Sequence, residues 1–148
     1  MHVAGLVSLE ASERDDLIDT FIIGRMRTAE QDFEYCLRQL VEVSLRALSP
    51  GINDPFTAMN CIDFLGAALA KVAQRKLPER QFSDADGILR VQTRPTTFAD
   101  LLDAAFNQIR QTAGGRTDVS LRLLGALAGI GANLQVDLHR ESVVKHAE

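Results

Sequence analysis

Residues 47–58 constrain the fold more than any other part of the sequence, because they place a dense polar turn between two apolar helical patterns. The segment is Ala-Leu-Ser-Pro-Gly-Ile-Asn-Asp-Pro-Phe-Thr-Ala. Pro50 has no amide hydrogen to donate and its ring clashes with the preceding turn, so it predicts the end of one helix. Asp54 and Pro55 predict the start of the next, because the carboxylate accepts bonds from unpaired amides and proline fits the first helical position. The segment therefore predicts a tight reversal between two helices.

Helical periodicity over most of the chain predicts a mainly α fold, a five-helix bundle-like domain with one short β-hairpin. The expected helices cover residues 13–23, 28–48, 54–76, 97–112 and 117 onward, with a charged, frayed tail from about residue 138 to 148. The expected caps, in chain order, are Ser12, Thr28 with Gln31, Asp54, and Thr97 with Asp100. Asp-Ala-Asp-Gly at residues 84–87 is a turn sequence and predicts a hairpin between residues 82 and 92.

The composition, 46% hydrophobic and 24% charged in 148 residues, is that of one globular domain over residues 1–148. A net charge of -4 argues against a nucleic-acid partner, which needs many Lys and Arg. No stretch of the chain is apolar enough over its length to predict a membrane span. Cys36 and Cys61 lie in apolar helical patterns and predict buried, reduced thiols. No metal or other cofactor is expected, because no cysteine or histidine has the spacing of a metal site.

The fifth expected helix carries several glycines and places its apolar residues on one side. We expect that side to contain Leu121, Leu124, Leu127, Ala128, Gly131 and Leu134. Gly125, Gly129 and Gly131 form a small-residue ridge, which favours close packing inside the domain over a dimer contact. The histidines, His2, His139 and His146, lie near the chain ends and are expected to be solvated.

Two polar clusters are the candidate sites. The first surrounds the start of the second helix and contains Arg25, Arg27, Gln31 and Asp32. The second surrounds the following turn and contains Arg46, Ser49, Asn53, Asp54 and Asp63. A helix rises about 1.5 Å per residue, so the ends of the second helix lie about 30 Å apart and one subunit cannot join the clusters.

Each cluster has two interpretations. Capping and ion pairing can explain both, although the sequence assigns no capping role to Ser49 or Asn53. As ligand sites, Arg25 and Arg27 would hold an anion at a helix start, and Asn53, Asp54 and Asp63 would hold a polar ligand or a cation. No serine, cysteine or histidine is paired with a base, so the sequence gives no support to nucleophilic catalysis.

Three segments, residues 23–32, 37–41 and 47–58, together resemble the soluble C-terminal part of a domain-of-unknown-function family of predicted bacterial membrane proteins. The resemblance is most specific over residues 23–65 and rests on the motif Ala-Leu-Ser-Pro-x-Ile-Asn-Asp-Pro-x-Thr-Ala. It implies that membrane-spanning helices absent from this chain precede the domain in a longer protein. It also implies a location on the cytoplasmic face of the bacterial inner membrane, and it implies no reaction.

These observations together predict a noncatalytic interaction or regulatory domain of a predicted bacterial membrane protein, acting as a homo-oligomer. The alternative is a domain that binds a small anion or cation, or an enzyme. A ligand would then be held by residues of the two clusters.

Overall fold

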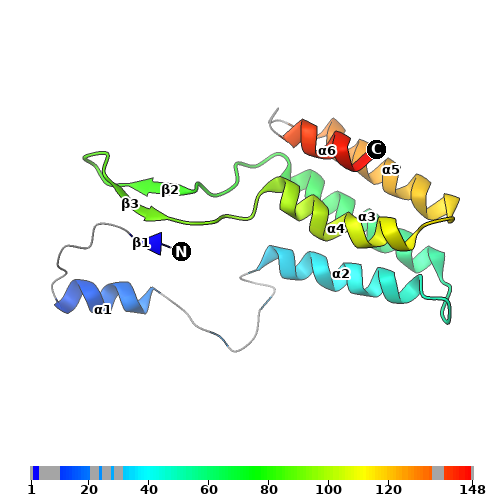
Figure 1. Ribbon diagram of the computed structural model, residues 1–148, viewed down its shortest axis with the longest axis horizontal. Helices are drawn as coiled ribbons and strands as arrows, with labels where there is room; N and C mark the ends of the chain where they lie inside the picture. Colours follow the sequence, from blue (N-terminus) through cyan, green and yellow to red (C-terminus); the bar gives the residue numbers. More distant parts are fainter. Residues whose placement is uncertain are drawn as a thin grey trace. The chain divides into compact units, whose positions relative to one another are not determined.

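The computed structural model describes residues 2–3, 11–20, 24, 28, 32–134 and 139–147. The chain divides into two compact units. One consists of Met1–Arg27 and Pro78–Pro95, and the other of Thr28–Leu77 and Thr96–Glu148. Figure 1 shows the elements of both units. The expectation of a single domain over residues 1–148 stays a prediction.

The smaller unit contains a three-stranded antiparallel sheet of order β1-β3-β2. Its strands are β1 (His2–Val3), β2 (Gln81–Ser83) and β3 (Leu89–Gln92). The turn between β2 and β3 is built on Asp84, whose Oδ1 accepts bonds from the amides of Asp86 and Ile88 at 3.0 and 2.9 Å. Gly87 adopts φ 79°, a left-handed conformation that glycine tolerates. The predicted hairpin is confirmed, whereas the third strand was not expected.

The first helix, α1, spans Ala11–Asp19 and differs from its prediction at both ends. It begins before Ser12, so Ser12 lies inside the helix instead of capping it. Apolar residues are few in this segment, and periodicity therefore fixed its limits poorly.

The larger unit contains the other helices of the described chain. They are α2 (Phe33–Ala47), α3 (Pro55–Val72), α4 (Phe98–Thr112), α5 (Thr117–Ala132) and α6 (Arg140–Ala147). Helix α2 packs against α3 and α4, α3 packs along α5, and α6 packs against α4 and α5. The prediction of a mainly α fold with a hairpin is thus confirmed. Among the described residues, no helix combines the length and the apolar character needed to cross a membrane.

Side chains from α2 to α5 form one core. Its largest fully buried members include Leu37, Leu48, Ile62, Leu65, Leu69, Phe98, Leu102, Phe106, Ile109 and Ile130. Burying each such side chain contributes about 1.5–3 kcal/mol to stability, so these contacts hold the helices together. Helix α3 contributes Ile62, Leu65 and Leu69 to this core.

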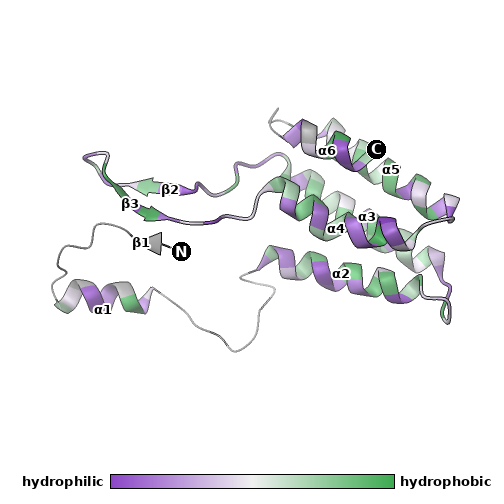
Figure 2. Cartoon of the chain, in the orientation of Figure 1, coloured by the Kyte–Doolittle hydropathy of each residue, from purple (hydrophilic) through white to green (hydrophobic). Residues whose placement is uncertain are grey.

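Helix α5 buries only part of the predicted side. Leu127 is buried as predicted, together with Val119, Leu123 and Ile130, whereas Leu121 and Leu124 are exposed. Apolar residues occur on more than one side of this helix, and Figure 2 colours parts of it in the green of hydrophobic residues. Several faces therefore fit the sequence pattern, and packing against α3 and α4 selects one.

The C-terminal segment was expected to be frayed, and this expectation is wrong. Residues 140–147 form α6, with Val143 buried at 7% exposure. Val143 packs beside Gly131 of α5, and the flanking His139 and His146 are also buried. The contacts that order α6 come from α4 and α5, and a local pattern of charges does not reveal them.

Candidate functional site

The turn between α2 and α3 is held by backbone and side-chain bonds of its own residues. The hydroxyl of Ser49 donates to the carbonyl of Arg46 at 2.7 Å, and the amides of Ile52 and Asn53 donate to the carbonyl of Ser49. Asn53 has φ 49°, a left-handed conformation that asparagine adopts more readily than most residues. Ser49 and Asn53 thus have the structural roles that the sequence did not assign.

Asp54 caps α3 as predicted. Its Oδ1 accepts from the amide of Thr57 at 3.1 Å, and its Oδ2 accepts from the Thr57 hydroxyl. The hydroxyl bond, followed by the amide bond, holds the pKa of Asp54 below its ordinary value. Pro55 occupies the first turn of the helix.

Arg116 fastens this turn to the start of α5. Its guanidinium donates to the carbonyl of Leu48 at 3.1 Å, across 68 residues of sequence. Asn53, Pro55 and Arg116 border an open hollow of about 520 Å³, together with Gly115, Thr117 and Asp118. The hollow lies beside Asn53, but the carboxylate of Asp54 faces Thr57 within its own helix.

The first predicted cluster can be followed only in part. Arg25, Arg27 and Gln31 lie outside the described residues. Asp32 is described, and it caps α2 by accepting from the amide of Tyr35 at 2.9 Å. The described helix accordingly begins at Phe33, five residues later than the predicted start at residue 28. Asp32 therefore has a structural role, and an anion site at this helix start stays a prediction.

Asp63 is separated from the turn by more than two turns of α3. It pairs with Arg122 of α5 at 3.5 Å, and both side chains are about half exposed. Ion pairs of this exposure contribute little to stability, so this contact shows where α3 and α5 meet but does little to stabilise the fold. Asp63, Ser49 and Asn53 thus do not form one site.

The Asp63–Arg122 pair lies over an open groove of about 630 Å³ between α3 and α5. Its lining is rich in small residues and includes Gly66, Ala67, Ala70, Gly125, Ala126 and Gly129. A Cβ on Gly125 or Gly129 would meet no atom of the described chain within 4 Å. The expectation that these two glycines serve internal packing is wrong, and the close approach of α3 and α5 occurs at Gly66.

The two C-terminal histidines are buried, which corrects the expectation that they are solvated. The ring of His139 lies against that of Phe98, with 4.5 Å between the ring centres. Burial lowers the pKa of His139, because the charged imidazole loses solvation. The burial of His2 is not described.

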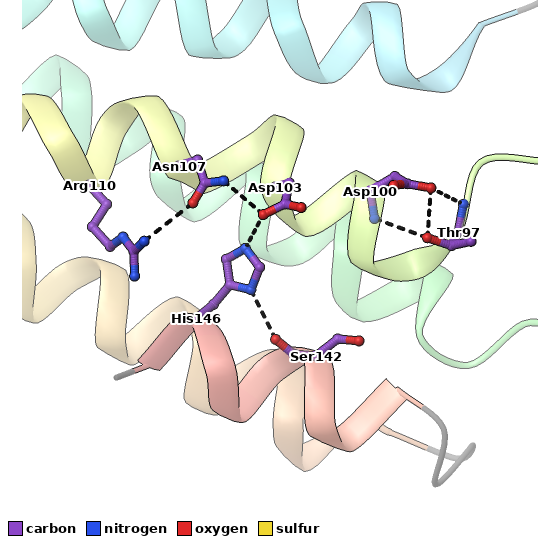
Figure 3. A network of polar contacts seen from close by, with 7 residues as sticks. All are labelled: Thr97, Asp100, Asp103, Asn107, Arg110, Ser142 and His146. Atoms are coloured by element: carbon purple, nitrogen blue, oxygen red, sulfur yellow. Dashed lines mark hydrogen bonds and ion pairs between the residues drawn. The ribbon is translucent and has the colours of Figure 1, made fainter.

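His146 joins a polar network on α4, shown in Figure 3. Its Nε2 lies 3.0 Å from Oδ1 of Asp103, and its Nδ1 lies 2.9 Å from the carbonyl oxygen of Ser142. Asn107 also donates to Oδ1 of Asp103 at 2.7 Å. Sequence reasoning missed this network, although His139, Val143 and His146 have the spacing of one helix face.

The chemistry available at these sites is limited. Cys61 is buried, and burial raises the pKa of its thiol, so the reactive thiolate is disfavoured. In the described part of the chain, no group of three or more His, Cys, Asp or Glu side chains could hold a metal ion. The fold and the sites define a mainly helical domain with a self-capped polar turn and an open groove between two helices.

Comparison with known proteins gives the family. The chain belongs to the family described as Predicted membrane protein (DUF2254), whose model matches residues 2–129. Helix α6 lies beyond the matched residues.

The chain is also 37% identical over 123 residues to uncharacterized proteins of Mycobacterium tuberculosis and Mycobacterium bovis. The match covers 83% of this chain but 23% of each relative. No solved structure matches the chain.

Proposed function

We propose that this chain is a noncatalytic interaction or regulatory domain of a bacterial membrane protein, and that it self-associates through the outer surface of α3 and α5. This surface, the α3–α5 face, consists of the groove between the two helices and six residues beside or within it. They are Phe56, Phe64 and Ala67 of α3 and Leu121, Gly125 and Gly129 of α5. The observation that carries the proposal is the exposure of its large apolar side chains. Phe56 is 74% exposed, Phe64 66% and Leu121 63%.

The exposed apolar residues lie on the two helices that form the groove. Phe56 and Phe64 are on α3, eight residues apart, and Leu121 is on α5. Leu121 lines the groove, and Ala67 lines it from the α3 side. Large exposed apolar side chains beside a groove are typical of a protein contact site.

A second copy of this chain fits the α3–α5 face because the face contains both a projecting apolar side chain and open space, and both a basic and an acidic residue. Leu121 is a projecting side chain, and Gly125 and Gly129 leave open space in the same groove. The groove carries the basic Arg122 and the acidic Asp118 one helical turn apart. A twofold contact presents the same surface on both subunits, so such a self-complementary face can pair with itself.

Light scattering over a range of concentrations tests the proposal. We expect the chain to form a dimer, and we expect Leu121→Glu to shift it to the monomer because a carboxylate would be buried in the contact. A chain that stays monomeric at the highest attainable concentration contradicts self-association.

The hairpin provides a matched control. Ile88 is 52% exposed and belongs to the other unit of the chain, so Ile88→Glu introduces a carboxylate at an exposed apolar residue that is not part of the α3–α5 face. We expect this variant to keep the dimer. If both variants dissociate it equally, the contact lies elsewhere or depends on charge alone.

The proposal includes a location on the cytoplasmic face of the inner membrane. The family is one of predicted membrane proteins, and the spans would belong to the parts of the longer relatives that this chain does not cover. The buried thiol of Cys61, which forms no disulfide, supports a reducing compartment. Reporter fusions to the domain of a full-length relative test this location. We expect a cytoplasmic fluorescent-protein fusion to be fluorescent. A signal from a periplasmic reporter fusion alone would contradict the proposal.

The small-ligand alternative makes a separate prediction. A ligand present at about a hundred times its dissociation constant stabilises the folded state by roughly 2.7 kcal/mol. Thermal unfolding with phosphate, nucleotides and divalent cations therefore tests it. A shift that is lost in Arg25→Gln or Asn53→Ala would favour this alternative, and unchanged unfolding would count against it.

A further inference from the structure

Helix α6 rests on α4 through a histidine whose two ring nitrogens both face acceptors. Nδ1 of His146 lies 2.9 Å from the carbonyl oxygen of Ser142, and a carbonyl can only accept. Nε2 lies 3.0 Å from Oδ1 of Asp103, and an ionised carboxylate can also only accept. Figure 3 shows the ring between these two oxygens.

Only the protonated imidazole has a hydrogen on both nitrogens. Either neutral tautomer leaves one lone pair directed at an oxygen about 3 Å away, and that contact becomes repulsive. The His146 side chain is 7% exposed, so water has little access to replace the lost bond. We propose that His146 is a pH-sensitive latch, which holds α6 on α4 when the ring is protonated and releases it when the proton is lost.

The charged side chains described near the ring are consistent with a latch that holds α6 when His146 is protonated. On α4 these are Asp103, next to the ring, and Arg110, which lies 3.5 Å from the side-chain oxygen of Asn107 and does not reach the ring. The carboxylate of Asp100 on α4 accepts hydrogen bonds from the amide and the hydroxyl of Thr97. On α6, Arg140 and Lys145 are exposed, and residues 123–132 of α5 contain no charged side chain.

Asp103 has a second donor, since Asn107 binds the same Oδ1 at 2.7 Å. This bond fixes the carboxylate on the side of α4 that faces α6, so the acceptor is in place before α6 docks. The Asp103 side chain is 55% exposed, and solvent therefore weakens its attraction for the imidazolium. We accordingly expect the latch to change the equilibrium for docking of α6 by about tenfold. This change is at the low end of the effects known for hydrogen bonds to charged groups.

NMR of the full chain between pH 5 and 8, the range in which histidine ordinarily changes charge, tests the latch. We expect the amides of Val143, Val144 and Lys145 to lose about tenfold in exchange protection, corrected for intrinsic rates, as the His146 ring loses its proton. Protection in α2 and α3 is expected to stay constant. Constant α6 protection while the His146 ring titrates overturns the proposal.

Two substitutions separate the latch from general stability. His146→Gln removes the titrating group, so α6 protection should no longer change with pH. Asp103→Asn supplies an amide that can donate to a neutral ring, so α6 should remain docked at pH 8. A pH-dependent loss of α6 protection that persists in either variant overturns the proposal.

His139 requires its own control, because it is buried on the same helix face and also titrates. Its protonation is opposed by burial, so it acts in the direction opposite to His146. The same measurements in His139→Phe should leave the His146-dependent change intact. If His139→Phe abolishes that change, the latch is assigned to the wrong histidine and the proposal fails.

Discussion

Gly66 of α3 lies against Ala126 of α5 so closely that a Cβ on residue 66 would stand 3.0 Å from the Cβ of Ala126. The two helices run parallel, since Asp63 meets Arg122 and Gln74 meets Asn133 along the same pair. We expect Gly66→Ala to destabilise the chain by about 1 kcal/mol, because overpacking of about 1–3 kcal/mol exceeds the gain in helix propensity. Urea unfolding measures this change.

Gly125→Ala is the matched control. It makes the same substitution on α5, where a Cβ would meet no described atom within 4 Å. Helix propensity alone should then stabilise the chain by about 0.5–1 kcal/mol. Unfolding should be measured at low protein concentration, so that self-association does not contribute. Equal effects of the two substitutions would show that the contact at Gly66 does not set the helix spacing.

The start of α4 is fixed by a capping box between Thr97 and Asp100. The amide of Asp100 donates to the Thr97 hydroxyl at 3.2 Å, and the amide of Thr97 donates to the Asp100 carboxylate at 2.8 Å. Thr97→Ala should cost about 1 kcal/mol of unfolding free energy, whereas Thr97→Ser should cost much less. Thermal or urea unfolding distinguishes them, and a similar loss in both would mean that the threonine methyl group matters more than the hydroxyl.

Asp54 provides a test of whether the turn is only structural. Its lowered pKa means that the ionised cap stabilises the fold above the ordinary value of 3.8, and that this contribution is lost as the pH falls through the lowered pKa. Asparagine also caps helices, so Asp54→Asn should keep neutral-pH stability and Asp54→Ala should reduce it. If Asp54→Asn abolishes dimer formation while unfolding is unchanged, Asp54 has a role beyond the cap.

His139 should make the chain less stable in mild acid. Burial lowers its pKa in the folded state, so the unfolded chain binds the proton more readily. Above the ordinary value of 6.5 the ring is neutral in both the folded and the unfolded chain, so its burial causes no loss of stability. Stability is lost as the pH falls from 6.5 through the lowered pKa. His139→Phe keeps a ring against Phe98 and should remove this loss. Urea midpoints at neutral and acidic pH, compared between the two proteins, measure it.

The parts of the fold that local chemistry controls could be predicted from the sequence. Pro50 ends α2 and Asp54 starts α3, because each acts on the amides of its own turn. Thr97 and Asp100 form their box for the same reason, and residues 84–87 make the hairpin turn. Of the candidate site, the capping role of Asp54 was predictable, whereas the Ser49 bond and the left-handed Asn53 required the folded turn.

Contacts between distant segments decided the rest. Strand β1 forms because Val3 pairs with Val91, and nothing near residue 3 specifies that partner. The buried side of α5 was largely mispredicted because apolar residues lie on more than one side of the helix, and packing against α3 and α4 selects Val119 and Ile130 for the core.

The sequence by itself determined the end of α2, the start of α3 and both ends of α4, since caps and proline act within a few residues. The tertiary structure alone decided which faces are buried and which stay open. It buried His139 and His146 by bringing Phe98 and Asp103 to them, and it left Leu121, Gly125 and Gly129 exposed on the α3–α5 face. The physical reason is that burial depends on the neighbours that folding supplies, and local sequence does not contain them.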